Sequence, residues 1–516
     1  MNIGETIARS AHRNPTGDAI IDPDTNRRST FAEMNARVNR LSHALRGELG
    51  LDKGDRVAIL AKNSTEFMET FYAAAKTGTI AQPMNWRLAV PELGRILENG
   101  SPKAIIVNEG FRGEMEQLQG LVDIPHWITF DPNEDSAFEE LLARHPDDEP
   151  PLDAADDDPF FILYTGGTTG VPKGALHSHR SAFTFMLNQT AAERIAPTDV
   201  YMLTGQMFHI PVVISMNYLA FARPVVLITF EPGKALELIE QERVSGFLAI
   251  TTMLNLLLNH EDFSKRDLSS LRILMYGGGP MPEPVIRRAM TELGCDLTQG
   301  YGQTEGGTMT FLPPWVHRDA LEGKNTHRLR SCGLESHMNS VQVLDEDGNP
   351  VPRDRETVGE IVVKSEANML RYWNQPEMTA QTIKDGWMWT GDAATWDQDG
   401  FVYIVDRKKE MIISGGENIY PAQVEQVLYQ HPAVLAAAVV GVPDDTWGEA
   451  VHAEVVLKPG ETATEGELIE LVRSQLASYM KPRSVAFVDE LPMSPTGKIM
   501  KHVIKKPFWE GRERNV

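Results

Sequence analysis

Apolar residues recur at helical spacing soon after the N-terminus. The segment from Thr30 to Arg46 places one apolar stripe on one helical face, made of Phe31, Met34, Val38, Leu41 and Leu45. Thr30 and Glu33 have the spacing of a capping box, in which two side chains satisfy backbone N–H groups of the first turn. We therefore expect an amphipathic helix that begins beside Thr30 and packs on a core.

Short apolar runs alternate with helical segments on both sides of Pro159. Before this residue, the pattern predicts strands at 56–60 and 104–107 and a helix at about 67–75. After it, strands are predicted in the run that starts at Phe161 and at 200–204, 224–228, 247–251 and 271–279. Such alternation predicts two successive α/β blocks, each a parallel sheet covered by helices.

The last third of the chain has a different pattern. From about Cys332, short strands separated by turn signals predict a small antiparallel barrel or sandwich. The sequences DEDGN and DQDG indicate hairpin turns, because neither continues into the twelve-residue ligand pattern of a calcium loop. Further on, the pattern predicts a compact α+β module with helices at 421–430 and 465–479 and strands at 435–442 and 451–457.

An acidic segment separates the two α/β blocks. Residues 133–158 are rich in Asp, Glu and Pro and include DDEPP and AADDDP. Charge runs of this kind are usually solvated faces. We expect a solvated connection that crosses the surface just before the next strand.

Composition excludes several classes of protein. The 516 residues exceed what one hydrophobic core usually supports, so more than one domain is expected. A formal net charge of -23 argues against nucleic acid or an anionic membrane as the primary partner. Cys295 and Cys332 give neither a disulfide framework nor metal-ligand spacing. We expect a cytoplasmic protein, because no signal peptide, membrane span, peroxisomal address or prenylation signal is visible.

The stretch FILYTGGTTGVPKG, from Phe161 to Gly174, joins an apolar strand to a loop of glycines and hydroxyl residues. Backbone N–H groups and hydroxyls in such a loop can surround a phosphate, although an isolated loop of this kind is as often simply solvated. The candidate phosphate-binding residues are Thr165, Gly166, Gly167, Thr168, Thr169, Gly170 and Lys173. The P-loop pattern does not fit, because Lys173 is followed by Gly174.

The loop YTGGTTGVPKG resembles the signature loop of the adenylate-forming (AMP-binding) superfamily, which includes acyl-CoA synthetases, aryl-CoA ligases, carrier-protein adenylation domains and luciferases. Four further motifs follow in the order of that family, namely YGGGPMP at 276–282, GYGQTEGG at 300–307, WTGD at 389–392 and SPTGK at 494–498. The resemblance implies an α/β fold in which a large N-terminal domain, 1–406, contains two α/β subdomains to about 330 and a small β-barrel at about 331–406. A small mobile α+β domain, 407–516, follows a hinge near Lys409.

The same resemblance assigns residues to the nucleotide and its metal. The implied contacts are the 165–173 loop at the β and γ phosphates, Thr304 at the α-phosphate, Asp392 and Arg407 at the ribose, and Gly278 and Tyr301 at the adenine. Lys498 stabilises the adenylation transition state. Glu305 offers a carboxylate suited to Mg²⁺, which prefers oxygen ligands, and Thr165 shares the metal.

An acyl pocket is implied as well. The pair Phe208–His209 lies beside the acyl carboxylate in the family, where His209 counts as catalytic with Lys498, Thr304 and Glu305. Here Gln206 and Pro211 replace the usual proline and glycine, and a lone histidine in an apolar segment is otherwise a core residue. The other pocket residues are Val213, Gly277, Gly279 and Gly302. Acetate-activating members carry tryptophan at the position of Gly302, so we expect acetate to be a poor substrate. No Arg or Lys occurs within 208–215, 277–281 or 300–305, which predicts an acid with one carboxylate and an apolar tail.

The residues assigned to CoA and the hinge are Lys409, Ser414, Gly415 and Gly416. The implied function is an ATP-dependent acyl-CoA synthetase for a medium- or long-chain fatty acid, with ATP, CoA and the acid as its small-molecule partners. A cinnamate-like aryl acid, an alicyclic or steroid side-chain acid, and a carrier protein as acceptor remain open. A non-catalytic nucleotide-binding protein is the most remote alternative. The sequence does not determine the oligomeric state, and a homodimer is one open arrangement.

Overall fold

The computed structural model describes residues 2–132, 135–152, 154–165, 172–279, 281–407, 410–414, 417–444, 446–493 and 499–510, without the side chains of 406, 407, 417 and 418. The chain forms two compact units. The first contains Met1–Val341 and Val363–Met388, and the second contains Gln342–Val362 and Trp389–Val516. The polypeptide therefore leaves the first unit, returns to it, and leaves it again.

Within the described part of the first unit, seven strands form a sheet in the order β18-β8-β7-β4-β3-β5-β6. Neighbours from β7 to β6 are parallel, whereas β8 is antiparallel to both β7 and β18. The bounds are β3 (Arg56–Leu60), β4 (Ile80–Pro83), β5 (Ala104–Asn108), β6 (His126–Phe130), β7 (Pro159–Thr165), β8 (Lys173–Ser178) and β18 (Arg371–Tyr372). The predicted phosphate loop joins β7 to β8.

Nine strands of the described residues form a second sheet, in the order β15-β14-β13-β12-β11-β9-β10-β1-β2. Its centre is parallel, and antiparallel pairs close both edges. The bounds are β1 (Asp18–Asp22), β2 (Arg27–Thr30), β9 (Tyr201–Leu203), β10 (Val225–Leu227), β11 (Gly246–Ala249), β12 (Ile273–Gly277), β13 (Asp296–Gln303), β14 (Gly307–Leu312) and β15 (Leu334–Glu335). The strands predicted from the alternating runs are present in both sheets, with slightly different ends.

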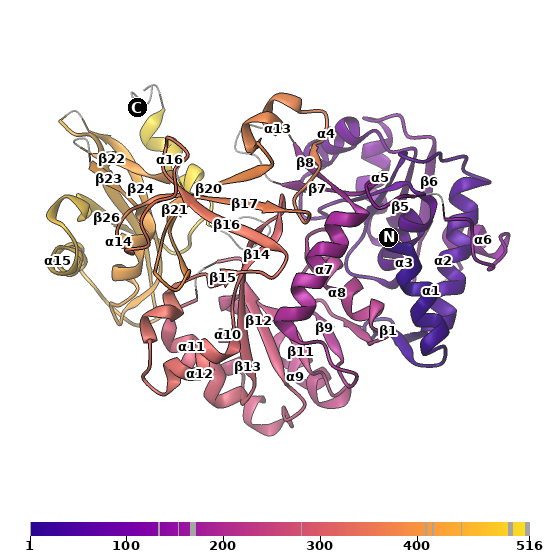
Figure 1. Ribbon diagram of the computed structural model, residues 1–516, viewed down its shortest axis with the longest axis horizontal. Coiled ribbons are helices and arrows are strands. Elements are labelled where there is room, and N and C mark those ends of the chain that lie inside the picture. The colour runs from indigo at the N-terminus through magenta and orange to yellow at the C-terminus, as the bar shows by residue number, and fades with distance from the viewer. Residues whose placement is uncertain are drawn as a thin grey trace. The chain divides into compact units, whose positions relative to one another are not determined.

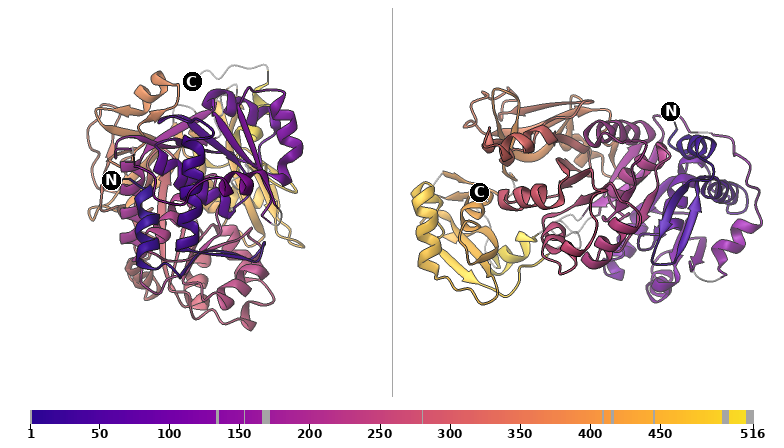
Figure 2. Two further views of the ribbon diagram at one scale, coloured as in Figure 1. Left: turned by 90° about the vertical axis from the view of Figure 1, so that its right-hand side faces the viewer. Right: turned by 90° about the horizontal axis from the view of Figure 1, so that it is seen from below.

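Helices cover and separate the two sheets. Helix α7 packs on both of them, since it contacts β8 of one and β12 and β14 of the other, and α8 lies beside α7 (Figure 1). Figures 1 and 2 also show the indigo helices α1, α2 and α3 side by side. The helices are α1 (Gly4–Arg13), α2 (Phe31–Arg46), α3 (Thr65–Thr77), α4 (Val90–Gly100), α5 (Arg112–Gln119), α6 (Ala137–Ala143), α7 (His179–Glu193), α8 (Pro211–Ala220), α9 (Pro232–Gln241), α10 (Thr251–Leu258), α11 (Glu283–Leu293), α12 (Pro314–Leu321) and α13 (Pro376–Thr382), with short 3-10 turns η1 (Glu109–Phe111), η2 (Phe263–Lys265) and η3 (Thr326–Arg330). None of the helices in the described residues has the length and apolar composition needed to cross a bilayer.

The predicted amphipathic helix is confirmed as α2. The Thr30 hydroxyl accepts a hydrogen bond from Glu33 N at 3.2 Å, and the Glu33 carboxylate accepts one from Thr30 N at 2.8 Å. All five residues of its predicted apolar stripe are buried. Local capping and periodicity together therefore fix both the start of this helix and the face that it buries.

One arginine joins three helices of the first unit. Arg37 of α2 donates to Glu69 of α3 at 2.5 Å and to Glu139 of α6 at 2.6 Å. The Glu69 side chain has no exposed area, and burial raises the pKa of its carboxyl although the nearby guanidinium of Arg37 opposes that rise. Burial lowers the pKa of Arg37 itself, but the two carboxylates raise it by more, so Arg37 stays charged.

The acidic segment is not the plain solvated connection that we predicted. It contains helix α6, and Glu149 accepts a hydrogen bond at 2.7 Å from Lys76, whose side chain is fully buried. A buried ammonium needs such a partner, because its transfer from water without one is costly. The segment therefore carries partners of two cations of the first unit, Glu139 for the half-buried Arg37 and Glu149 for the buried Lys76.

An antiparallel sheet carries the chain between the two units. Its order is β16-β17-β20-β19, with β21 paired to β20. The bounds are β16 (Asn339–Leu344), β17 (Gly359–Ser365), β19 (Ile383–Lys384), β20 (Trp387–Trp396) and β21 (Val402–Arg407). Both predicted turns are present. Asp345 accepts two backbone N–H groups within DEDGN, and Asp397 accepts those of Asp399 and of Phe401, the residue just after DQDG.

The C-terminal module is the predicted α+β structure. Its sheet has the order β23-β22-β25-β24, with β26 parallel to β25. Successive residues of β24 face opposite sides: Ala437 and Val439 belong to the core with α14 and α15, whereas Ala438 and Val440 pack with Ile504 of α16. The bounds are β22 (Ile412–Ser414), β23 (Glu417–Ile419), α14 (Pro421–Leu428), β24 (Val434–Asp444), β25 (Gly448–Leu457), α15 (Glu465–Gln475), η5 (Ser478–Met480), β26 (Ser484–Phe487) and α16 (Lys501–Trp509). The expected mixed α/β fold is thus confirmed, whereas the domain boundaries at about 330 and 406 and the hinge remain predictions.

Candidate active site

The strands β7 and β8 place the two described ends of the predicted phosphate loop opposite each other. Thr165 and Lys173 are direct partners in this antiparallel pair, and Thr165 Oγ1 donates to the Lys173 carbonyl at 3.5 Å. Both residues are half-buried. The rest of the predicted cradle lies outside the described residues, namely Gly166, Gly167, Thr168, Thr169 and Gly170.

The turn between β13 and β14 carries Thr304 and Glu305, and a buried histidine holds it. His177 Nε2 donates to the Thr304 carbonyl oxygen at 2.8 Å, which requires the proton on Nε2 because a carbonyl can only accept. Burial lowers the pKa of His177 to about 4, so the ring is neutral near pH 7. His177 lies on β8 four residues after Lys173, and its ring stacks on Phe161 of β7 at 4.9 Å. The turn is thus tied to the strands that flank the phosphate loop, through a residue that the sequence analysis did not select.

Glu305 has one oxygen engaged by a tyrosine. Tyr372 donates its hydroxyl to Glu305 Oε1 at 2.6 Å, and no hydrogen bond to Oε2 is found among the described residues. Those residues contain no cluster of three or more His, Cys, Asp or Glu side chains that could hold a metal ion by themselves. A carboxylate oxygen is a ligand type that Mg²⁺ accepts beside substrate phosphates and water, so the donor chemistry of Glu305 fits the predicted metal. The share of Thr165 in that metal stays a prediction.

The glycines of YGGGPMP differ in what surrounds them. A Cβ at Gly277 would lie 2.4 Å from the Gly300 carbonyl oxygen, so glycine is needed there for close strand pairing. Gly278 has φ +79°, which also favours glycine. Gly279 has no atom within 4 Å of a Cβ position and borders open space. These glycines therefore serve the backbone at the first two positions and leave room at the third.

The backbone around position 302 leaves room only for glycine. A Cβ at this position would meet the Gly307 carbonyl oxygen at 1.9 Å and Thr308 Cα at 2.9 Å, next to an irregularity in the β13–β14 pairing. A tryptophan here would require the turn to move, in addition to any filling of a pocket. The open acyl pocket beside Gly302 stays a prediction.

Two alanine variants separate these roles. Gly302→Ala should lower the free energy of unfolding by about 1–3 kcal/mol, the usual cost of overpacking. Gly279→Ala should leave the melting temperature unchanged and, because it fills the predicted acyl pocket, shift preference toward shorter acids. Thermal unfolding and a panel of acids measure the two effects. Equal destabilisation by both variants would show that Cβ crowding is not what requires Gly302.

The predicted carboxylate-binding segment packs on a tryptophan. Trp86 lies edge-on to Phe208 with ring centroids 6.5 Å apart, and its Nε1 donates to Gln206 at 3.1 Å. Phe208 and Val213 are buried, whereas His209 is half-buried with its ring 4.7 Å from that of Phe208. This environment agrees with an apolar wall next to His209.

The segments 208–215, 277–281 and 300–305 contain no Arg or Lys, but two cations from other segments lie next to the predicted acyl pocket residues. Lys62 Nζ and the Arg87 guanidinium lie over the Trp86 ring, 5.5 and 5.0 Å from its centroid. Burial lowers the pKa of Arg87. These cations come from other parts of the chain, so a search limited to the three motifs could not find them, and the argument for a single carboxylate is weaker than the sequence indicated.

Tyr301 lies on β13 of the first unit and is half-buried. The predicted residues from position 392 onward belong to the second unit. Asp392 of β20 is buried and pairs in register with Arg407 of β21, so the two residues predicted to bind one ribose are direct neighbours. Ser414 ends β22 and pairs with Glu417 and Gly448. Lys409, Gly415, Gly416 and Lys498 lie outside the described residues.

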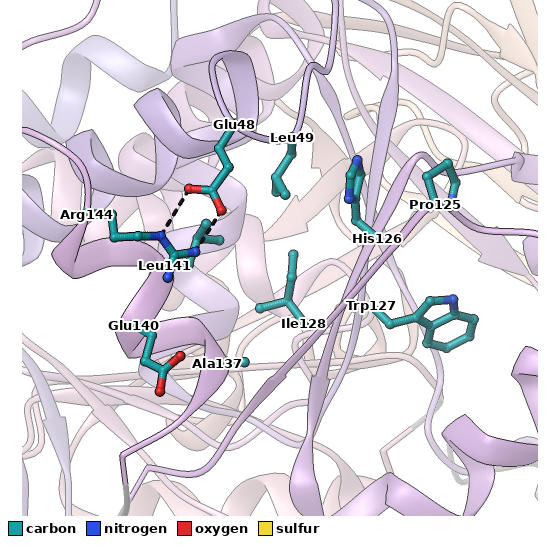
Figure 3. Close-up of a pocket in the computed structure, with 10 residues that line it drawn as sticks. All are labelled: Glu48, Leu49, Pro125, His126, Trp127, Ile128, Ala137, Glu140, Leu141 and Arg144. Carbon is teal, nitrogen blue, oxygen red and sulfur yellow. Dashed lines mark hydrogen bonds and ion pairs between the residues drawn. The ribbon is translucent and has the colours of Figure 1, made fainter.

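A surface hollow of about 280 Å³ lies between α6, β6 and the segment after α2. Figure 3 shows the ion pair of Arg144 and Glu48 at one side of it, at 2.7 Å. None of its lining residues belongs to the five motifs. We assign no role in the reaction to this hollow.

Comparison with known families shows to which family the chain belongs. A family model described as AMP-binding enzyme matches residues 7–373, and one described as AMP-binding enzyme C-terminal domain matches residues 423–498. The chain belongs to the AMP-binding enzyme family. The predicted superfamily is therefore confirmed, and its two family segments contain all of the motifs except WTGD and the hinge.

Members of the AMP-binding family that resemble this chain cover nearly all of it. A long-chain-fatty-acid–CoA ligase of Mycobacterium tuberculosis is 37% identical over 513 residues, covering 98% of each chain. A feruloyl-CoA synthase of an Amycolatopsis species is 36% identical over 514 residues, covering 98% of this chain and 99% of the relative. The solved structure of a Mycobacterium tuberculosis fatty acyl CoA synthetase has a TM-score of 0.79 and 35% identity, covering 99% of each chain.

Proposed function

We propose that this enzyme activates a medium- or long-chain fatty acid as acyl-AMP and transfers the acyl group to CoA. The observation that carries the proposal is the hydrogen bond between His177 and the Thr304 carbonyl, which joins positions 127 residues apart. It brings the turn with Thr304 and Glu305 to the strands that flank the phosphate loop. This contact supports the proposal, because the turn and the strands carry Thr304, Glu305, Thr165 and Lys173, which we assign to the phosphates and their metal.

The first half-reaction would make the acid a better acyl donor. A carboxylate is unreactive because its leaving group would be oxide. In the proposed step, a carboxylate oxygen attacks the α-phosphorus of ATP and pyrophosphate leaves with the bonding electrons. The chain binds the β and γ phosphates through the loop that begins at Thr165, and Thr304 and Lys498 stabilise charge on the α-phosphoryl oxygens. Mg²⁺ at Glu305 and Thr165 would neutralise phosphate charge when bound.

Other residues would orient the substrates. We assign Gly278 and Tyr301 to the adenine and Asp392 and Arg407 to the ribose, where a carboxylate can accept from two vicinal hydroxyls. The acyl chain would lie along Phe208, Val213 and the glycines of 277–279, with His209 near its carboxylate. Water exclusion by these apolar side chains would protect the reactive anhydride.

The second half-reaction would use a different arrangement of the chain. The thiol of CoA attacks the acyl carbonyl, the bond to phosphate oxygen breaks, and AMP leaves. We propose that the C-terminal part turns about Lys409, which withdraws Lys498 and brings Ser414, Gly415 and Gly416 toward the pantetheine arm. Glycines suit contact with so narrow a group.

A cinnamate-type acid is the second candidate substrate. The similarity to a feruloyl-CoA synthase favours it at almost the same identity as the fatty-acid enzyme. Both acids have one carboxylate and an apolar body. They differ in the width and rigidity of that body, which the pocket would have to match.

Acid-dependent exchange of labelled pyrophosphate into ATP tests the proposal. We would compare acetate, octanoate, palmitate, ferulate and a long dicarboxylate, and then measure transfer to free CoA and to a phosphopantetheinylated carrier protein. We expect octanoate or palmitate to be fastest, acetate slowest, and CoA to be the better acceptor. Faster exchange with ferulate than with the fatty acids would make a cinnamate-type acid the substrate. Faster transfer to the carrier protein than to CoA would make the carrier protein the acceptor. No exchange with any acid would reject the proposal that the protein is an enzyme.

A further inference from the structure

Hydrogen bonds to two successive backbone carbonyls hold the turn that carries Glu305. His177 donates to the Thr304 carbonyl, and Met369 N donates to the Glu305 carbonyl at 2.7 Å. The next residue, Gly306, donates its N–H to the Gln303 carbonyl at 3.1 Å, and a Cβ there would meet the side-chain ends of Met388 and Met309. The backbone of Glu305 therefore has little freedom, and what remains to be set is the direction of its side chain.

Tyr372 is held independently of Glu305. It forms the end of β18, where it pairs with Ala175 of β8, and its N–H donates to the Thr379 hydroxyl at 3.0 Å. The next residue, Trp373, donates its N–H to the Gly174 carbonyl at 2.7 Å and its Nε1 to the Asn99 carbonyl at 3.1 Å. The tyrosine thus stands on the seven-stranded sheet and reaches a turn of the nine-stranded sheet.

The hydrogen bond from Tyr372 selects one orientation of the carboxylate. Its oxygen lies 2.6 Å from Glu305 Oε1, and Tyr372 is only 6% exposed, so water competes poorly for the hydroxyl. With Oε1 engaged, Oε2 is the oxygen left for a cation. Removing a group that hydrogen-bonds a metal ligand in this way commonly lowers the affinity for the metal about 10- to 100-fold.

We propose that Tyr372 is a positioning residue that holds the Glu305 carboxylate for the metal of a bound metal–nucleotide. The inference rests on the proposed function, because it takes Glu305 as the residue that meets that metal. The inference adds to the candidate site a residue that lies outside the five motifs. It also gives strand β18 a role, which is to hold Tyr372 in place. The role is indirect, since Tyr372 would act on the nucleotide only through Glu305.

The test compares ATP binding with and without Mg²⁺ by calorimetry in the absence of acid, so that no turnover occurs. The quantity of interest is the ratio of the dissociation constant in EDTA to that in excess Mg²⁺. We expect Tyr372→Phe to lower this ratio about 10- to 100-fold. Metal-free ATP affinity should stay within about twofold of wild type, because the phenylalanine keeps the ring and its packing.

A matched control is available elsewhere in the first unit. Tyr218 also donates its hydroxyl to a glutamate, Glu193, at 3.1 Å, and Tyr218→Phe removes the same atom from the same kind of pair. It should leave the ratio unchanged. An unchanged ratio in Tyr372→Phe, a ratio of one in wild type, or an equal loss of metal-free ATP affinity would each overturn the inference.

A second experiment tests the same inference with a double variant, so that the result does not depend on whether Tyr372→Phe alone folds. Glu305→Asp keeps the charge but withdraws the oxygen from the hydroxyl, and adding Tyr372→Phe to it should change the ratio less than about twofold. Independent, additive losses would overturn the inference. Wild-type pyrophosphate exchange is run in parallel: its absence would reject the proposed function, whereas active wild type with an unaffected Tyr372→Phe ratio would reject only the role of Tyr372.

Discussion

Lys498→Ala should slow acid-dependent pyrophosphate exchange by at least ~10²-fold, the scale of one lost electrostatic stabiliser of a transition state. It should leave CoA thioester formation from supplied acyl-adenylate close to wild type. The physical reason is that bonds to the α-phosphorus form and break in the first step only, so only that step has a phosphoryl-transfer transition state for the lysine to stabilise. The second step breaks an anhydride already made, and the proposed rotation removes the lysine from the path of the thiol.

Lys506 supplies the control for this experiment. It is an exposed lysine of α16, eight positions further along, so Lys506→Ala removes the same charge from the same part of the chain. We expect it to leave both half-reactions unchanged. If Lys498→Ala slowed both half-reactions equally, the proposal that the C-terminal part adopts a different arrangement for each half-reaction would be wrong.

Arg37→Met should lower the free energy of unfolding by about 3–5 kcal/mol, because it leaves the buried Glu69 carboxylate without its partner. Chemical denaturation with two probes would measure the loss. Arg37 is also the residue that joins α6 to α2 and α3, so amide exchange in α6 should rise more than elsewhere.

The pH dependence gives this prediction its sign. Loss of Arg37 removes the charge that lowers the pKa of Glu69, so burial raises that pKa further above its ordinary 4.5. The folded state then binds a proton that the unfolded state releases above pH 4.5, and stability falls as the pH rises through this window. The deficit relative to wild type should therefore be larger at pH 8 than at pH 5.

Two further variants frame the result. Arg40 of the same helix pairs with the exposed Asp147 at 2.9 Å, and Arg40→Met should cost less than about 1 kcal/mol. The double variant Arg37→Met/Glu69→Met replaces the buried charges by apolar groups and should recover part of the loss. A deficit independent of pH would mean that lost packing, not the uncompensated carboxylate, sets the cost.

Local signals predicted most of the fold. Thr30 and Glu33 fixed the start of α2, and the run from Arg56 to Leu60 is a strand with those bounds in the structure. The acidic connection was misread because its partners, Arg37 and Lys76, lie in helices far upstream. Charge patterning reports solvation along the chain, but it cannot report a buried cation brought there by tertiary packing.

In the candidate site, too, residues within local motifs could be predicted from the sequence, whereas residues whose role depends on distant contacts could not. The motif around Glu305 could be selected from the sequence because its residue types suit a metal and a phosphate. Tyr372 and His177 could not, because their importance depends on a strand pairing and on hydrogen bonds that link remote positions. For Gly302 the residue was selected, but its crowding by Gly307 is a matter of backbone geometry that no sequence pattern displays.

The course of the chain between its two units constrains how the enzyme can be divided or recombined. The polypeptide crosses between them after positions 341, 362 and 388, so no single cut releases either unit whole. A fragment that stops at the first crossing would lack residues 363–388, including the tyrosine behind Glu305. A chimera joined to a relative at one junction after position 388 would build the sheet of β16, β17 and β20 from two parents. Swapping substrate-binding halves between such enzymes therefore calls for three matched junctions.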